Sequence, residues 1–135
     1  PVIKHHSLAG ATLGMKNWYG VLGGRRNRLH QDVNQSIVDL AQALRPTLTI
    51  LDGTRVMFRN GPTGGSLNDV RREDLVIAST DPVLADAAAL PSLGRAEESI
   101  PYLAMAAQAG LGRLKPRWKR DLSRPPSEAD QRTHF

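Results

Sequence analysis

The stretch DVNQSIVDLAQALRPTLTILDG, residues 32–53, contains a helix, its end and a strand in one segment. Its first half carries a single apolar stripe at helical spacing, which predicts an amphipathic helix over residues 32–44. The stripe consists of Val33, Ile37, Leu40, Ala41 and Leu44. Pro46 favours the end of this helix. The apolar run that follows predicts a short buried strand that ends at Asp52 and Gly53.

The same alternation of short strands and helices continues on both sides of this stretch. The predicted strands cover residues 2–5, 48–53 and 75–80, and the predicted helices cover residues 9–19, 32–44, 82–90 and 96–109. This order indicates a layered α/β fold of short, mostly parallel strands flanked by helices. Three strands are few for a whole sheet. We therefore expect an incomplete or C-terminal part of a larger α/β domain, with an N-terminal segment or a partner chain, such as a second copy, covering the open edge.

Composition limits the chemistry that this chain can perform. The 135 residues contain no cysteine, which excludes a disulfide, a thiolate nucleophile and an iron–sulfur cluster held by this chain. Absence of cysteine does not decide the compartment, because such proteins occur on both sides of a membrane. No apolar run approaches the roughly 18 residues of a membrane span, so we expect none.

The net charge of +5 is concentrated near the C-terminus. We divide the chain into an α/β domain over residues 1–112 and a basic, proline-containing tail over residues 113–135. Between residues 113 and 124 the tail carries six cations, Arg113, Lys115, Arg117, Lys119, Arg120 and Arg124. With Trp118 among them they could bind nucleic acid, but solvated or inter-subunit tails of this kind are commoner, so we expect no nucleic-acid partner.

Polar residues gather at the predicted strand ends. Ligands of open α/β sheets bind beyond the carboxyl ends of parallel strands. Lys4-His5-His6, Asp52 and Asp81 hold these positions, and we expect them to converge at one edge of the sheet. The following loops add further polar groups, namely Lys16, Asn17, Arg25, Arg26, His30 and the glycines Gly61, Gly64 and Gly65.

Several of these motifs match a known family in order and spacing. They are Lys4-His5-His6, Thr12-Leu13-Gly14-Met15-Lys16-Asn17-Trp18-Tyr19-Gly20, Arg26, His30, Leu48–Gly53, Asn60–Gly65 and Ala78–Asp86. Over residues 1–112 the chain resembles the family known as domain of unknown function 362. Members of the family are longer at the N-terminus, which implies that this chain is the C-terminal part of the family domain. Many are fused to ferredoxin-like iron–sulfur segments, a role that a chain without cysteine does not take over.

Our leading hypothesis is an enzyme or cofactor-handling domain that binds a small anionic molecule at the strand ends. Lys16, His30 and Asp52 are the predicted catalytic residues, because a desolvated lysine, a histidine and a strand-end carboxylate can all move protons. The predicted ligand-binding residues are Lys4, Asn17, Arg26, Gly61, Gly64, Gly65 and Asp81. The alternative is a non-catalytic module that docks a redox partner or completes a larger α/β protein.

Each of these residues also has a structural explanation. Lys16 could be a surface lysine, Asp81 could cap the helix that begins at Pro82, and the glycine loop could be a flexible turn or a lid. His5 and His30 could hold a divalent metal with Asp52 or Asp81, although adjacent histidines on a strand point apart. Ordinary capping and hydrogen bonding is the commoner role for such histidines.

Overall fold

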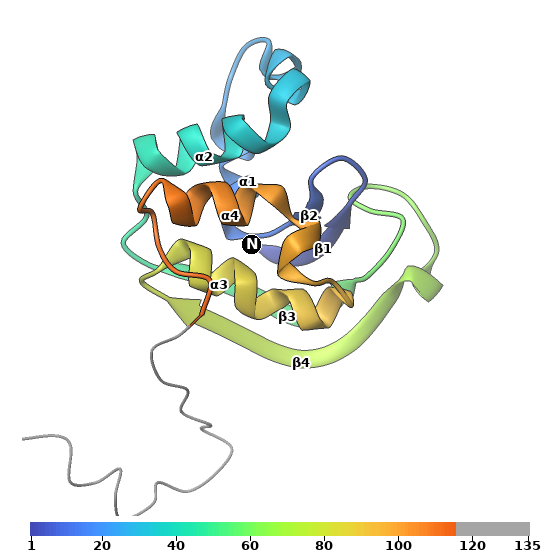
Figure 1. Cartoon of the computed structure of the whole chain (residues 1–135). Helices are drawn as coiled ribbons and strands as arrows, with labels where there is room; N and C mark the ends of the chain where they lie inside the picture. Colours follow the sequence, from blue (N-terminus) through green and yellow to red (C-terminus); the bar gives the residue numbers. More distant parts are fainter. Residues whose placement is uncertain (116–135) are drawn as a thin grey trace, which may run out of the picture.

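A computed structural model describes residues 1–115 and forms a mixed four-stranded sheet in the order β2-β1-β3-β4 (Figure 1). The strands are β1 (Val2–His6), β2 (Gly10–Thr12), β3 (Thr49–Met57) and β4 (Val70–Ser79). The helices are α1 (Gly14–Asn17), α2 (Val33–Leu44), α3 (Pro82–Ala89) and α4 (Pro101–Gln108), with short 3-10 helices η1 (Trp18–Val21), η2 (Arg26–Asp32), η3 (Leu67–Asp69), η4 (Leu90–Leu93) and η5 (Glu97–Ser99). The layered α/β class expected from the sequence is confirmed.

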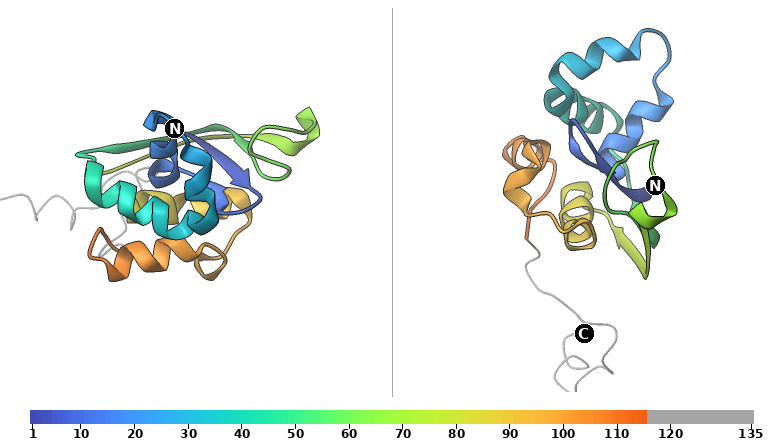
Figure 2. Two further views of the ribbon diagram at one scale, coloured as in Figure 1. Left: turned by 90° about the horizontal axis from the view of Figure 1, so that it is seen from above. Right: turned by 90° about the vertical axis from the view of Figure 1, so that its right-hand side faces the viewer.

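The helices gather on one face of the sheet (Figure 2). α3 packs against β3 and β4, and α4 packs against α2 and α3. Leu51 and Val56 of β3 lie fully buried on the helix-covered side, together with Ile3 of β1. The opposite side carries one row of register partners, Val2, Asp52 and Val76, of which Val76 is 66% exposed. The core therefore lies between the sheet and the helices, and the outer face of the sheet is open in the described part of the chain.

The central helix follows the sequence closely. Asp32 caps α2 by accepting a 3.2 Å hydrogen bond from the Gln35 N–H, and Val33, Ile37 and Ala41 are buried. The helix ends where Arg45 adopts a left-handed conformation with φ of 39°. The residue before a proline avoids the α-helical region, so Pro46 explains this ending. α3 also matches its predicted range to within one residue.

Two predictions about the sheet were wrong. Residues 9–19 do not form one helix, because Gly10–Thr12 pair with β1 as the antiparallel strand β2 and only Gly14–Asn17 are α-helical. The strands are also not mostly parallel: β1 and β3 are parallel, whereas β1–β2 and β3–β4 are antiparallel. The connection from Met57 to Val70 contains only the short η3 and no α-helix that would carry the chain across the sheet, and β4 returns antiparallel beside β3.

The antiparallel direction of β4 corrects the predicted convergence of strand ends. Met57 at the end of β3 is paired with Val70 at the start of β4, so Ser79 lies at the other end of the sheet, opposite Thr49. Asp81 therefore follows β4 at the edge away from His6. β3 also runs on to Met57, which puts Asp52 inside the strand rather than at its end.

The described residues contain no helix long and apolar enough to cross a bilayer. The part of the predicted basic tail from residue 116 onward, with Trp118, lies outside the described residues.

Candidate functional site

Five basic side chains from three elements gather around His6, and the charges of the other four act on its pKa. We call them the basic cluster: Lys4, His5, His6, Lys16 and His30. β1 supplies the first three, α1 supplies Lys16 and η2 supplies His30. Burial, together with repulsion from Lys16, His30, His5 and Lys4, lowers the pKa of His6 to about 4. The fold thus brings together four of the predicted site residues, and it adds His6.

Lys16 is the most buried lysine of the described chain, with only 6% of its surface exposed. Its Nζ atom lies 4.6 Å from the centroid of the Tyr19 ring, a cation–π contact. Burial lowers the pKa of Lys16, and the nearby charge of Lys4 lowers it further. Among residues 1–115 no carboxylate lies within ion-pair distance of Lys16. This corrects the alternative of an ordinary surface lysine.

Tyr19 joins the two halves of the basic cluster. Its ring meets the ring of His30 edge-on, with 5.4 Å between the centroids, while its other neighbour is the Lys16 amine. The Tyr19 hydroxyl donates a 3.2 Å hydrogen bond to the carbonyl of Leu29, and the Ser36 hydroxyl donates to the same oxygen. Burial raises the pKa of Tyr19. These contacts fix η2, and with it His30, against Tyr19.

His6 has a defined protonation pattern. Its Nδ1 accepts hydrogen bonds from the N–H groups of Leu8 and Ala9, at 3.1 and 3.2 Å. An accepting Nδ1 carries no proton, so the neutral ring holds its proton on Nε2. His6 is therefore a neutral hydrogen-bond donor within the basic cluster at neutral pH.

A buried carboxylate on α3 holds the helix that carries Lys16. Asp86 accepts hydrogen bonds from the N–H groups of Gly14 (2.8 Å) and Met15 (3.1 Å) and from the Tyr102 hydroxyl (3.3 Å). A Cβ atom on Gly14 would lie 2.6 Å from Cγ2 of Thr49 and 2.9 Å from Oδ1 of Asp86. Only glycine allows α1 to approach this closely.

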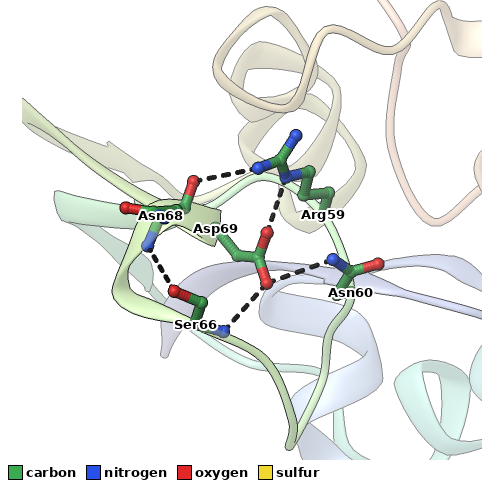
Figure 3. Close-up of polar contacts among 5 residues, drawn as sticks. All are labelled: Arg59, Asn60, Ser66, Asn68 and Asp69. Carbon is green, nitrogen blue, oxygen red and sulfur yellow. Dashed lines mark hydrogen bonds and ion pairs between the residues drawn. The ribbon is translucent and has the colours of Figure 1, made fainter.

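A second buried carboxylate, Asp69, holds the loop between β3 and β4, the glycine loop that contains Gly61, Gly64 and Gly65 (Figure 3). Asp69 accepts from Arg59 Nε (2.6 Å), Asn60 Nδ2 (3.1 Å) and the Ser66 N–H (3.0 Å). The bond from the Ser66 N–H, followed by those from Arg59 and Asn60, lowers the pKa of Asp69.

Two of the three glycines in this loop have steric reasons to be glycine. A Cβ on Gly65, whose φ is 117°, would collide with Oδ2 of Asp69. One on Gly61 would collide with the carbonyl oxygen of His5, which shows that the loop lies against the end of β1. At Gly64 the nearest neighbour of an added Cβ is the Asn60 carbonyl oxygen, 4.0 Å away.

Four predicted site residues have their own places in the structure. Asp52 is exposed on the outer face of β3, where its carboxylate accepts from the Thr54 N–H at 2.9 Å. Asp81 caps α3 by accepting from the Leu84 N–H, and it also accepts from the Arg113 N–H, both at 2.9 Å. Arg26 and Asn17 are exposed, Asn17 next to Lys16 at the end of α1.

Metal binding by His5 and His30 gains no support from the geometry. Within residues 1–115 no three histidine, aspartate or glutamate side chains come together in a group that could hold a metal ion.

The sequence placed His6 at a strand end without assigning it a role, Asp86 could equally have formed a salt bridge, and Tyr19 was not selected as a site residue. Asp86 had a usable signal, since it is an acid between Ala85 and Ala87 on an otherwise apolar helix. Such a residue is buried only when hydrogen-bonded.

Comparison with known proteins identifies the family. A family model described as a domain of unknown function (DUF362) matches residues 1–91, the start of the chain, rather than the 1–112 that we expected. The thylakoid-associated protein sll1697 of Synechocystis sp. is 33% identical over 120 residues, covering 83% of this chain. The chain spans 36% of the length of that relative. No solved structure matches. The chain therefore belongs to the family known as domain of unknown function 362.

Proposed function

We propose that this chain is an enzyme or cofactor-handling domain that binds a small anion at the basic cluster. One observation carries the proposal: the amine of Lys16 is buried beside Lys4 and has no carboxylate partner in the described chain. Buried charges in proteins are normally paired. An anion bound between Lys4 and Lys16 would provide that pairing and would offset the desolvation of the amine.

The other members of the cluster suit the same ligand. His6 is a neutral donor, because its Nδ1 already accepts two backbone N–H groups. His30 lies against Tyr19, where its imidazole can exchange a proton with a bound molecule. Lys16 with a lowered pKa can act as a base or a nucleophile toward that molecule. Asp52 and Arg26 have no part in this version of the site.

Titration calorimetry at low salt tests the proposal, with inorganic phosphate and malonate as phosphoryl and carboxylate probes. We expect saturable binding of at least one probe, weakened tenfold or more by Lys16→Met. Lys115→Met is the matched control, because it removes the same charge from an exposed position, and its affinity should stay within about twofold of wild type. No binding of either probe, or equal affinity in both variants, would refute the proposal.

The same variants separate this proposal from the non-catalytic docking module. An anion site loses affinity, not stability, when Lys16 is replaced by methionine, because the unbranched apolar side chain still packs on Tyr19. A structural lysine would show the reverse, with a lower melting temperature and unchanged ligand affinity. Thermal denaturation of both variants, measured beside the calorimetry, distinguishes the two.

A further inference from the structure

Asp86 joins three helices at a point far from any solvent. The residue sits on α3 and is fully buried, yet all of its partners lie on other elements. Oδ1 accepts from the Gly14 N–H, and Oδ2 accepts from the Met15 N–H and from the Tyr102 hydroxyl of α4. The first two donors are the first two residues of α1.

α1 depends on this contact for its start. It is only four residues long, and its N-cap residue, Leu13, makes no side-chain capping bond. A helix of this length has no stability of its own. Asp86 supplies the missing cap from the opposite half of the chain, by accepting from the first two N–H groups of α1.

The position of the Lys16 amine follows from the position of α1. Lys16 directly follows Met15, and in the described chain its side chain makes no hydrogen bond or ion pair that would hold it independently. Its contact with the Tyr19 ring is non-directional compared with a hydrogen bond. We propose that Asp86 is a positioning residue that sets the place of the Lys16 amine in the basic cluster. The identity of the ligand that the Lys16 amine binds rests on the proposed function, whereas the placement of the amine by Asp86 does not.

Side-chain NMR of the ligand-free protein tests the placement. The chain has four lysines, so a ¹³C-lysine sample gives few signals, and Lys16→Arg assigns the one of interest. Asp86→Asn keeps the size of the side chain and can still accept from Gly14 and donate to Tyr102. It offers the Met15 N–H no acceptor. We expect the pKa of Lys16 to rise toward that of an ordinary lysine in this variant, with at least a fivefold loss of phosphate or malonate affinity.

Tyr102→Phe is the matched control, because it removes a hydrogen bond from Asp86 and leaves the cap of α1 in place. It should lower the melting temperature and leave the Lys16 titration as in wild type. If Asp86→Asn does not fold, Gly14→Ala disturbs the same contact from the other side and should release Lys16 in the same way.

A lower melting temperature with an unchanged Lys16 titration, in Asp86→Asn or in Gly14→Ala, would reduce Asp86 to a structural residue and overturn the inference. Failure of anion binding is a separate result. A Lys16 pKa that responds to Asp86 in a protein that binds neither probe would refute the proposed function and retain the positioning role.

Discussion

Replacing Asp86 by asparagine should change how stability depends on pH in a direction opposite to that of most carboxylates. Burial raises the pKa of Asp86 to about 7, against 3.8 for an ordinary aspartate, although its three hydrogen bonds act to lower it. In the folded protein the group therefore keeps its proton up to about pH 7, while in the unfolded chain it loses the proton near pH 4. The unfolded state binds fewer protons between these values, so the contribution of Asp86 to stability falls as pH rises through this range.

The size of the effect follows from the two pKa values. A difference between 3.8 and about 7, at about 1.4 kcal/mol for each pKa unit, corresponds to about 4 kcal/mol. Asp86 is fully buried, so solvent does not screen the effect. Asparagine does not titrate. The unfolding free energy of wild type minus that of Asp86→Asn should therefore fall by about 4 kcal/mol between pH 4 and pH 7 and stay level above pH 8.

Urea denaturation of both proteins at half-unit pH steps from 4 to 8.5 measures this difference. The comparison is needed because His6 titrates in the same range with the opposite sign. Its pKa is lowered from 6.5 to about 4, so its contribution is complete above pH 6.5 and is lost as pH falls toward 4. Subtraction removes the part of the His6 effect that the two proteins share, and it leaves the lost Met15 bond as a constant offset. A difference curve that is flat, or that rises with pH, would refute the argument.

Three further outcomes are expected. Gly14→Ala should cost about 1–3 kcal/mol in urea denaturation, because its Cβ would lie 2.6 Å from Cγ2 of Thr49; Gly20→Ala, with no neighbour within 4 Å, is the control and should change little. The ring of His6 should titrate near pH 4 in proton NMR, and a midpoint near 6.5 would contradict its burial. Gly65→Ala should speed hydrogen exchange of the Ser66 amide, whose N–H donates to Asp69, whereas the neighbouring Gly64→Ala should not. Equal exchange rates in the two variants would show that the loop does not depend on this contact.

Local signals predicted the parts of the fold that depend on local interactions. The stripe of α2, its Asp32 cap and the proline after it are all within one segment of about fifteen residues, and the predicted bounds agree with the structure. α3 begins as expected at Pro82 with Asp81 as its cap. In both cases the sequence contains the residues that start and stop the helix.

The predictions were wrong where contacts between residues distant in the sequence determine the local structure. Gly10–Thr12 look helical beside Leu13 and Met15, but they pair with β1, and Gly10, the partner of His6, takes a left-handed φ of 77°. The direction of β4 depends on how the loop held by Asp69 turns the chain. The hydrophobic periodicity of the sequence does not predict that direction. Lys16 and His30 both contact the ring of Tyr19, a link that depends on tertiary contacts and that no local pattern indicates.

The hydrogen bonds to Asp86 also determine the stage of folding at which α1 and the residues around it become ordered. Gly14 and Asp86 are 72 positions apart, and Tyr102 is 16 positions further on. Contacts that close such long loops form late, because the loss of chain entropy precedes the gain from the contact. During synthesis every member of the basic cluster leaves the ribosome long before Asp86 does. A nascent chain stopped at residue 80 would carry all five basic side chains but would lack Asp86 and Tyr102, which hold α1 in place. The basic cluster is therefore ordered by the half of the protein that contributes none of its charges.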